Sequence, residues 1–134
     1  MSYSIGETCE KTGLSADTLR YYERIGLLRK IERNSSGQRR YTDSDLAQLG
    51  FIQRSQSMDF SLAEIADLLA LRNSQGDVKS EVRAVTEQKL AAIDEKIATL
   101  QKLRSELADL VSQCRASEGV CCPIIKHMDN HEDC

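Results

Sequence analysis

The feature that most constrains the fold is a regular apolar seam in the second half of the chain. Its members recur three or four residues apart, at Leu90, Ile93, Ile97, Leu100, Leu103, Leu107 and then Leu110 or Val111, and the next seam position is Cys114. Spacing of this kind, sustained over about three to four heptads, is typical of a coiled coil. A single helix cannot bury such a stripe alone, so we expect an antiparallel coiled coil with a second copy of the chain.

Two short helices are predicted near the start of the chain. Ser4 and Glu7 stand three residues apart, as in a capping box, and Gly13 is suited to end the first helix. Ser15 is a good N-cap for a second helix over 16–24. Two short helices joined by a tight turn that contains glycine predict a helix-turn-helix.

The segment after these helices has the pattern of a β-hairpin. Extended runs at 27–31 and 39–42 flank the turn-rich residues 33–38. A hairpin that follows a helix-turn-helix predicts a winged helix.

Charge is distributed unevenly along the chain. The protein carries a formal net charge of −3, but residues 1–58 hold more basic than acidic side chains and residues 59–134 hold more acidic than basic ones. Within 20–41, seven basic residues face two acidic ones. A compact basic face on an acidic body is the footprint expected of a DNA-binding head.

Two further helices and a polar hinge connect the wing to the seam. Thr42 or Asp43 is suited to cap the third helix, Ser61 the fourth, and small polar residues at 73–77 form the hinge. The predicted fold is therefore mainly α, with a short helix after the last loop. Its parts are a winged helix-turn-helix DNA-binding domain at 1–73, the hinge and dimerisation helix at 74–113, and an effector loop and tail at 114–134.

Cysteine is concentrated at the end of the chain. Four of the five cysteines are Cys114, Cys121, Cys122 and Cys134, and their clustering indicates a site. In a reducing cytosol such residues are ligands or redox groups more often than disulfides. The remaining one, Cys9, lies in the first predicted helix and is interpreted as a core residue.

A series of motifs resembles the MerR family of bacterial transcription regulators, nearly from end to end. The motifs are IGE near the start, TLRYYERIGLL at 18–28, GQRRY at 37–41, DL-QL-FI at 45–52, F-SLAEI-LL at 60–69, the long helix and CPII at 122–125. The last segment looks most like the copper-efflux regulator branch, CueR, whose metal loop joins two cysteines with seven residues between them.

The resemblance implies how the head would contact promoter DNA. In the family the second helix enters the major groove, with Ser15 and Thr18 near its start, and the wing straddles the backbone. Arg20 has the fork geometry to bind guanine or phosphate bidentately. We expect phosphate contacts from the remaining predicted residues, Tyr21, Arg33, Arg39 and Tyr41, whereas Tyr22 is expected to face the core. The family further implies a homodimer that distorts an overlong promoter spacer for RNA polymerase.

The paired thiols Cys114 and Cys122 suit a soft monovalent ion. Polarizable sulfur selects Cu(I), with Ag(I) or Au(I) as mimics, and two ligands suffice for a linear centre. Pro123 would stiffen the loop, and Ile124 and Ile125 would roof it. Cys121 either points elsewhere or supplies a third ligand. Cys134 with His127 and His131 could form a second exposed site, although scatter along a tail explains them more simply.

Lys79 departs from the family pattern. It falls where copper, silver and gold regulators have serine and where zinc, cadmium, lead and mercury regulators have cysteine, a position expected to approach the partner's metal loop. Without a cysteine there, a tetrahedral divalent site loses its third thiolate. The ammonium could offset the thiolate charge, lower a thiol pKa, or extend into solvent.

These features together predict a cytoplasmic, metal-responsive activator of a resistance or efflux promoter. Three alternatives remain: a thiol-based redox or electrophile sensor of the same fold, a divalent-metal sensor, and a metal buffer without gene control. No acid–base pair or nucleophile is spaced for catalysis, so an enzyme is not expected. No run of eighteen apolar residues predicts a membrane span.

Overall fold

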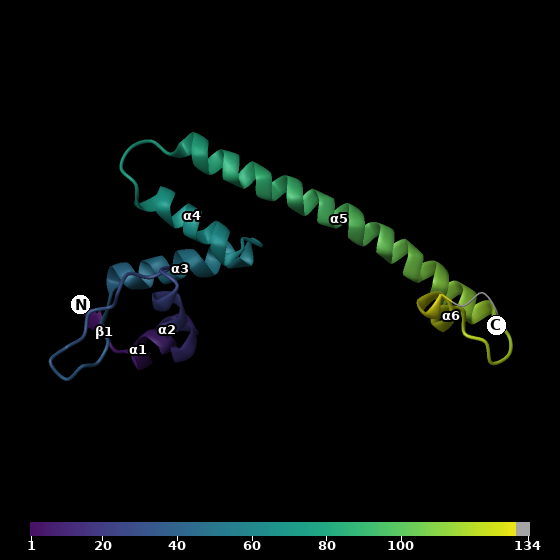
Figure 1. The fold of residues 1–134 in the computed structure, drawn as a ribbon, viewed down its shortest axis with the longest axis horizontal. Coiled ribbons are helices and arrows are strands. Elements are labelled where there is room, and N and C mark those ends of the chain that lie inside the picture. Colours follow the sequence, from purple (N-terminus) through teal and green to yellow (C-terminus); the bar gives the residue numbers. More distant parts are fainter. Residues whose placement is uncertain (131–134) are drawn as a thin grey trace. The chain divides into compact units, whose positions relative to one another are not determined.

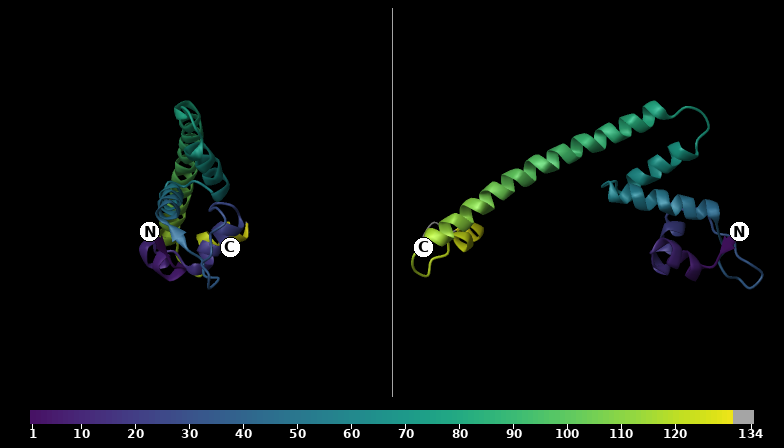
Figure 2. Two further views of the ribbon diagram at one scale, coloured as in Figure 1. Left: turned by 90° about the vertical axis from the view of Figure 1, so that its left-hand side faces the viewer. Right: turned by 180° about the vertical axis from the view of Figure 1, so that it is seen from behind.

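A computed structural model describes residues 1–130 of the chain and divides it into two compact units, one over residues 1–86 and one beginning at residue 87 (Figures 1 and 2). In chain order the elements are β1 (Ser2–Tyr3), α1 (Ile5–Thr12), α2 (Ala16–Arg24), β2 (Tyr41–Thr42), α3 (Asp43–Ser57), α4 (Leu62–Asn73), α5 (Lys79–Ala116) and α6 (Pro123–Asp129). The mainly helical prediction is confirmed. No helix in the described part of the chain is long and apolar enough to cross a membrane.

The predicted caps set the ends of the first two helices. The Ser4 hydroxyl accepts a hydrogen bond from the Glu7 amide at 3.1 Å, and the Glu7 carboxylate accepts one from the Ser4 amide at 3.1 Å. Gly13 ends α1 in the left-handed conformation with φ 77°, which glycine adopts without steric cost. Ser15 caps α2. The helix-turn-helix is therefore formed as predicted.

The wing differs in register from the predicted hairpin. Residues 27–31 form no strand, because Leu27, Leu28 and Ile31 are buried in the core of the first unit. The hairpin is instead closed further along the chain. The Arg40 amide donates to the Glu32 carbonyl at 2.8 Å, and a bridge joins Arg33 with Arg39.

The end of the predicted second strand pairs with the start of the chain. Strand β2 lies antiparallel to β1, with Ser2 opposite Thr42 and Tyr3 opposite Tyr41. This pairing was not predicted, because a two-residue strand has no periodicity to detect. It holds the N-terminus beside the base of the wing.

One hydrophobic core joins the helices of the first unit. Leu19 and Tyr22 of α2 pack with Leu49 and Ile52 of α3 and with Ile65 of α4, all fully or almost fully buried. Tyr22 faces the core as predicted, and Cys9 packs against the core from α1. The core fixes α2 by its apolar side and leaves its polar side exposed.

A buried carboxylate attaches the segment after α2 to the start of α3. Thr42, not Asp43, is the N-cap, and Asp45 completes its capping box. Asp45 also accepts two hydrogen bonds from Arg29, at 3.1 Å from Nε and 3.0 Å from Nη2. A bidentate pair of this kind has the fixed geometry that positions a chain segment.

Helix α5 is a single helix of 38 residues whose apolar stripe is largely exposed in one chain. Exposed members are Leu90, Ile97, Leu100, Leu103, Leu107 and Val111. Leu110 is buried, because α6 packs beside the C-terminal end of α5 (Figure 1). The helix extends beyond the predicted boundary at 113, so Cys114 lies within its last turn.

Candidate nucleic-acid interface and metal site

The N-terminal end of α2 presents a small polar network. The Ser15 hydroxyl accepts a hydrogen bond from the Thr18 amide at 3.1 Å and lies 2.8 Å from the Thr18 hydroxyl. Arg20 is exposed one turn further along, and its Nη1 donates to the Asp17 carboxylate at 3.2 Å. Ser15 and Arg20 are exposed and Thr18 is half-buried, and their contact with DNA stays a prediction.

The other half of α2 carries an aromatic residue stacked with a cation. Tyr21 is 39% exposed, and the Arg24 guanidinium lies 5.3 Å from the centre of its ring. Arg24 was not among the predicted DNA contacts. The contact between Tyr21 and Arg24 could have been predicted from their spacing, because residues three apart are neighbours on a helix surface.

The wing brings two predicted arginines toward Arg20. Arg20, Arg33 and Arg39 line one shallow cavity of about 230 Å³, together with Ser4 at the start of α1. Arg33 donates to the Gly37 carbonyl at 2.9 Å, within the hairpin. The cluster is strongly cationic, and phosphate oxygens are the acceptors that guanidinium groups bind best.

Glu23 connects the wing to α2, and sequence reasoning missed it. One carboxylate oxygen accepts from Arg39 Nε at 3.0 Å and the other from the Ile31 amide at 3.3 Å. Glu23 is 16% exposed and Arg39 is 23% exposed, so the pair is shielded from solvent. The wing and α2 are thereby held in a fixed relation.

Tyr41 is not available for a phosphate contact, which corrects the prediction for this residue. Its side chain is completely buried, and its hydroxyl has no hydrogen-bond partner within the described residues. Burial raises the pKa of Tyr41. The alternation of a short strand explains the difference, because β2 turns residue 41 inward beside the core.

The structure brings Cys114 and Cys122 together. Both are half-buried and free, one in the last turn of α5 and the other immediately before α6. The pKa of the Cys122 thiol is lowered by the backbone N–H groups of Ile125 and Ile124 and by a hydrogen bond with Cys114. Hydrogen bonds from backbone N–H groups at the start of a helix stabilise the thiolate and so favour ionisation of this thiol. Two adjacent sulfurs, one with a lowered pKa, fit a soft metal ion.

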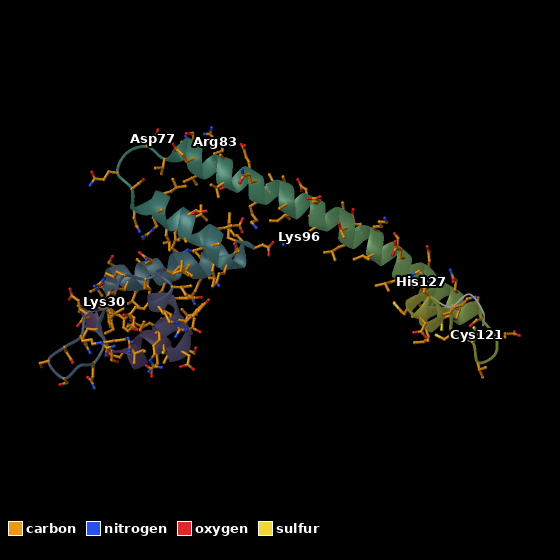
Figure 3. All side chains as sticks on the ribbon, viewed as in Figure 1. Lys30, Asp77, Arg83, Lys96, Cys121 and His127 are labelled. Carbon is orange, nitrogen blue, oxygen red and sulfur yellow. The ribbon has the colours of Figure 1, made fainter. Side chains whose placement is uncertain are left out.

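Ile124 and Ile125, which were predicted to cover the cysteine pair, shield it only partly in one chain. Ile124 is half-buried, but Ile125 is 58% exposed. Cys121 is half-buried and lines a polar cavity of about 780 Å³ between α5 and α6, together with His127 (Figure 3). Within residues 1–130 no group of three or more His, Cys, Asp or Glu side chains is placed to hold a metal ion. His131 and Cys134 lie outside the described residues.

Lys79 is exposed at the first position of α5. Its amide donates to the Asp77 carboxylate at 2.9 Å, which caps the start of the helix. This contact lies within the first unit. The role of the Lys79 ammonium beside a partner's metal loop stays a prediction.

Comparison with known proteins identifies similar sequences over almost the whole chain. The family described as "MerR HTH family regulatory protein" matches residues 3–71, and "MerR, DNA binding" matches residues 46–110. The transcriptional regulator HmrR of Rhizobium leguminosarum is 40% identical, covering 95% of this chain and 98% of its own. The mercuric resistance operon regulatory protein of Shigella flexneri is 37% identical, covering 91% and 84%.

Solved structures agree with these sequence matches. The regulator PbrR691 of Ralstonia metallidurans, solved with lead(II), is 34% identical with a TM-score of 0.79 and covers 94% of this chain and 98% of its own. HiNmlR, a MerR family regulator solved on promoter DNA, is 31% identical with a TM-score of 0.60, covering 87% and 85%. Both the fold and the sequence therefore place this chain in the MerR family of helix-turn-helix transcription regulators, which bind DNA and are not enzymes.

Proposed function

We propose that the protein is a homodimeric activator that binds a metal-resistance or efflux promoter and responds to a monovalent soft metal, Cu(I) foremost. The observation that carries this proposal is the contact between Cys114 and Cys122, with the lowered pKa of Cys122. A metal must displace the thiol protons, and a lowered pKa reduces that cost. The metal-responsive relatives support the broader proposal of a metal sensor.

The number of sulfurs favours a monovalent ion. Within the described residues one chain offers a two-thiol pair and no cluster of three ligands. A linear Cu(I), Ag(I) or Au(I) centre needs two thiolates, whereas tetrahedral Zn²⁺ needs four ligands in a structural site. Lys79 stands where the family resemblance would place the third thiolate of a divalent sensor. The likeness to a mercuric resistance operon regulator and to a regulator solved with lead(II) keeps a divalent sensor as the competing proposal.

The exposed side of α2 and the arginine cavity support promoter binding. Arg20, Arg33 and Arg39 supply three guanidinium groups at one place, and α2 also carries the predicted contacts Ser15, Thr18 and Tyr21. Metal binding at the end of α5 would act on the promoter through the dimer, by shifting the equilibrium between two DNA-bound shapes. RNA polymerase would then recognise the realigned promoter.

Anaerobic titration with Cu(I) and with Zn(II), each against a competing chelator, tests the metal assignment. We expect one Cu(I) held tightly per thiol pair, weak Zn(II) binding, and loss of the Cu(I) affinity in Cys114→Ser and in Cys122→Ser. Cys9→Ser is the matched control, because Cys9 packs against the core of the first unit. Tight Zn(II) with weak Cu(I) would remove the copper assignment.

A redox sensor is the second candidate, favoured by the same sulfur contact. A thiol oxidant would convert Cys114 and Cys122 to a disulfide, and the lowered pKa of Cys122 would assist. This function predicts that oxidant alone alters transcription in vitro and that Cu(I) does not. In vitro transcription with each agent separates the two functions.

A further inference from the structure

Helix α2, which we propose enters the major groove, carries an exposed acidic side chain in its first turn. Asp17 is in the first turn of α2, and its side chain is 97% exposed. A carboxylate brought against phosphates is repelled, so this position opposes nonspecific binding. The other acid of α2, Glu23, is shielded and held by Arg39 and the Ile31 amide. Asp17 therefore has a different role from Glu23.

Stability does not explain the contact between Asp17 and Arg20. The two side chains are 97% and 46% exposed, and their ion pair of 3.2 Å joins residues three apart on one helix. Exposed pairs of this kind contribute little to folding. An acid in the first turn of a helix does stabilise the helix dipole, but any acid in that turn would do so. The particular arrangement, a carboxylate that holds one arm of a DNA-facing arginine, therefore points to a role outside folding.

The pair matches the edges of two adjacent bases in the major groove. Arg20 uses Nη1 for Asp17 and keeps further N–H donors, which suit the O6 and N7 acceptors of guanine. Asp17 is an acceptor only, so the base edge that suits it is the amino group of cytosine. Bases that present only acceptors to the groove at that point would leave a desolvated carboxylate without a donor.

Resting on the proposed promoter binding, we infer that Asp17 is a specificity-determining residue. It accepts a hydrogen bond from a cytosine amino group next to the guanine bound by Arg20, and it orients the Arg20 fork. A good contact of this kind discriminates between bases by about 5- to 150-fold. Asp17 also weakens binding to unrelated DNA through its charge.

In vitro selection from duplexes with a randomised central region tests this inference, because the protein itself recovers its preferred bases. The full-length wild type, Asp17→Asn and Asp17→Ala are compared. The matched control is Asp67→Asn, which removes the same charge from an exposed position of α4. Thermal unfolding of each variant verifies that it folds. A merely structural role of Asp17 would not move the base preference.

We expect the wild type to select a two-fold symmetric motif with cytosine at one defined position of each half-site. Asp17→Ala should lose that preference and retain the rest of the motif. Asp17→Asn should shift it toward adenine, because asparagine pairs bidentately with the N6 and N7 atoms of adenine. Both variants should bind randomised DNA more tightly than the wild type, and Asp67→Asn should select the wild-type motif.

Two results would overturn the inference, and a third concerns the proposed function. An unchanged motif in both Asp17 variants would show that the carboxylate contacts no base. If the base preference weakened equally at every position of the selected motif, the Asp17 variants would have a general effect on affinity and no effect on one base. If the wild type itself selects no motif, the proposed promoter binding fails, and the role of Asp17 falls with it.

Discussion

At the scale of single residues, two acids with similar chemistry have opposite surroundings. Glu23 is shielded and accepts from Arg39 and the Ile31 amide, whereas Asp17 is exposed and accepts from Arg20 on its own helix. The sequence TLRYYER shows both the tyrosines and the basic residues, but it does not show which acid is bound internally. That distinction depends on the path of the wing, which brings Arg39 back to α2.

Replacing Glu23 by Gln should loosen the wing. The amide keeps the volume of the side chain but loses the charge that binds Arg39, and a hydrogen bond to a charged group contributes about 1.5–3 kcal/mol. We expect the free energy of unfolding to fall by about 1–3 kcal/mol and the affinity for promoter DNA to fall with it. Chemical denaturation and fluorescence anisotropy measure the two quantities.

Glu10→Gln is the control for the Glu23 variant, since Glu10 is an exposed acid of α1. It should leave stability and DNA affinity near the wild-type values. Equal stability of Glu23→Gln and wild type would show that the carboxylate does not hold the wing in place.

At the scale of elements, the parts that could be predicted are those fixed by local chemistry. Ser4, Ser15 and Ser61 each cap a helix as expected, because a capping bond involves residues only three apart. The hairpin register and the burial of Tyr41 were predicted wrongly. They depend on the core around Leu27 and Ile31 and on the pairing of β2 with a strand about forty residues earlier.

The candidate metal site was predictable for a related reason. Cys114 follows from the helical seam and Cys122 from the Cys-Pro sequence that starts α6, so both sulfurs are placed by regular elements. The acidity of Cys122 was not predictable from the sequence, because it arises from amides at the start of a helix that forms only beyond the loop. The prediction that Ile125 covers the cysteine pair is not met in one chain, where this side chain is largely exposed.

The exposed stripe of α5 should determine dimerisation. Leu103 is near its middle and is 46% exposed in one chain. Replacing it by Glu would place a charge in the expected helix–helix contact, and an unpaired buried charge costs far more than the lost contact itself. We expect the variant to shift from dimer to monomer at micromolar concentration in analytical ultracentrifugation.

Ser105→Glu introduces the same charge on an exposed part of α5 away from the stripe and should remain dimeric. If Leu103→Glu is as dimeric as this control, the stripe is not the contact between the two copies. The comparison also separates loss of the interface from a general effect of added charge on the long helix.

At the scale of the whole molecule, the proposed metal site and the DNA-binding head belong to different units of the chain. Cys114 and Cys122 lie in the second unit, while Arg20 and Lys79 lie in the first. By family resemblance, the start of α5 in one copy approaches the metal loop of the other. Metal selectivity would then be decided by residue 79 of the partner copy as well as by the two cysteines.

Lys79→Cys tests this shared site directly. The new thiol would add a third sulfur to the pair formed by Cys114 and Cys122, and a third thiolate favours divalent ions with higher coordination numbers. We expect Zn(II) affinity to rise by at least about tenfold, which corresponds to about 1.4 kcal/mol. Competition with a chelator measures it.

Lys79→Ser is the control and should keep the Cu(I) response with weak Zn(II) binding, because serine removes the ammonium without adding sulfur. The gain in Lys79→Cys must also disappear in the monomeric Leu103→Glu background, since a thiol on the same chain would not need a partner. A Zn(II) affinity that survives there would place the third ligand within one chain and would contradict the shared site.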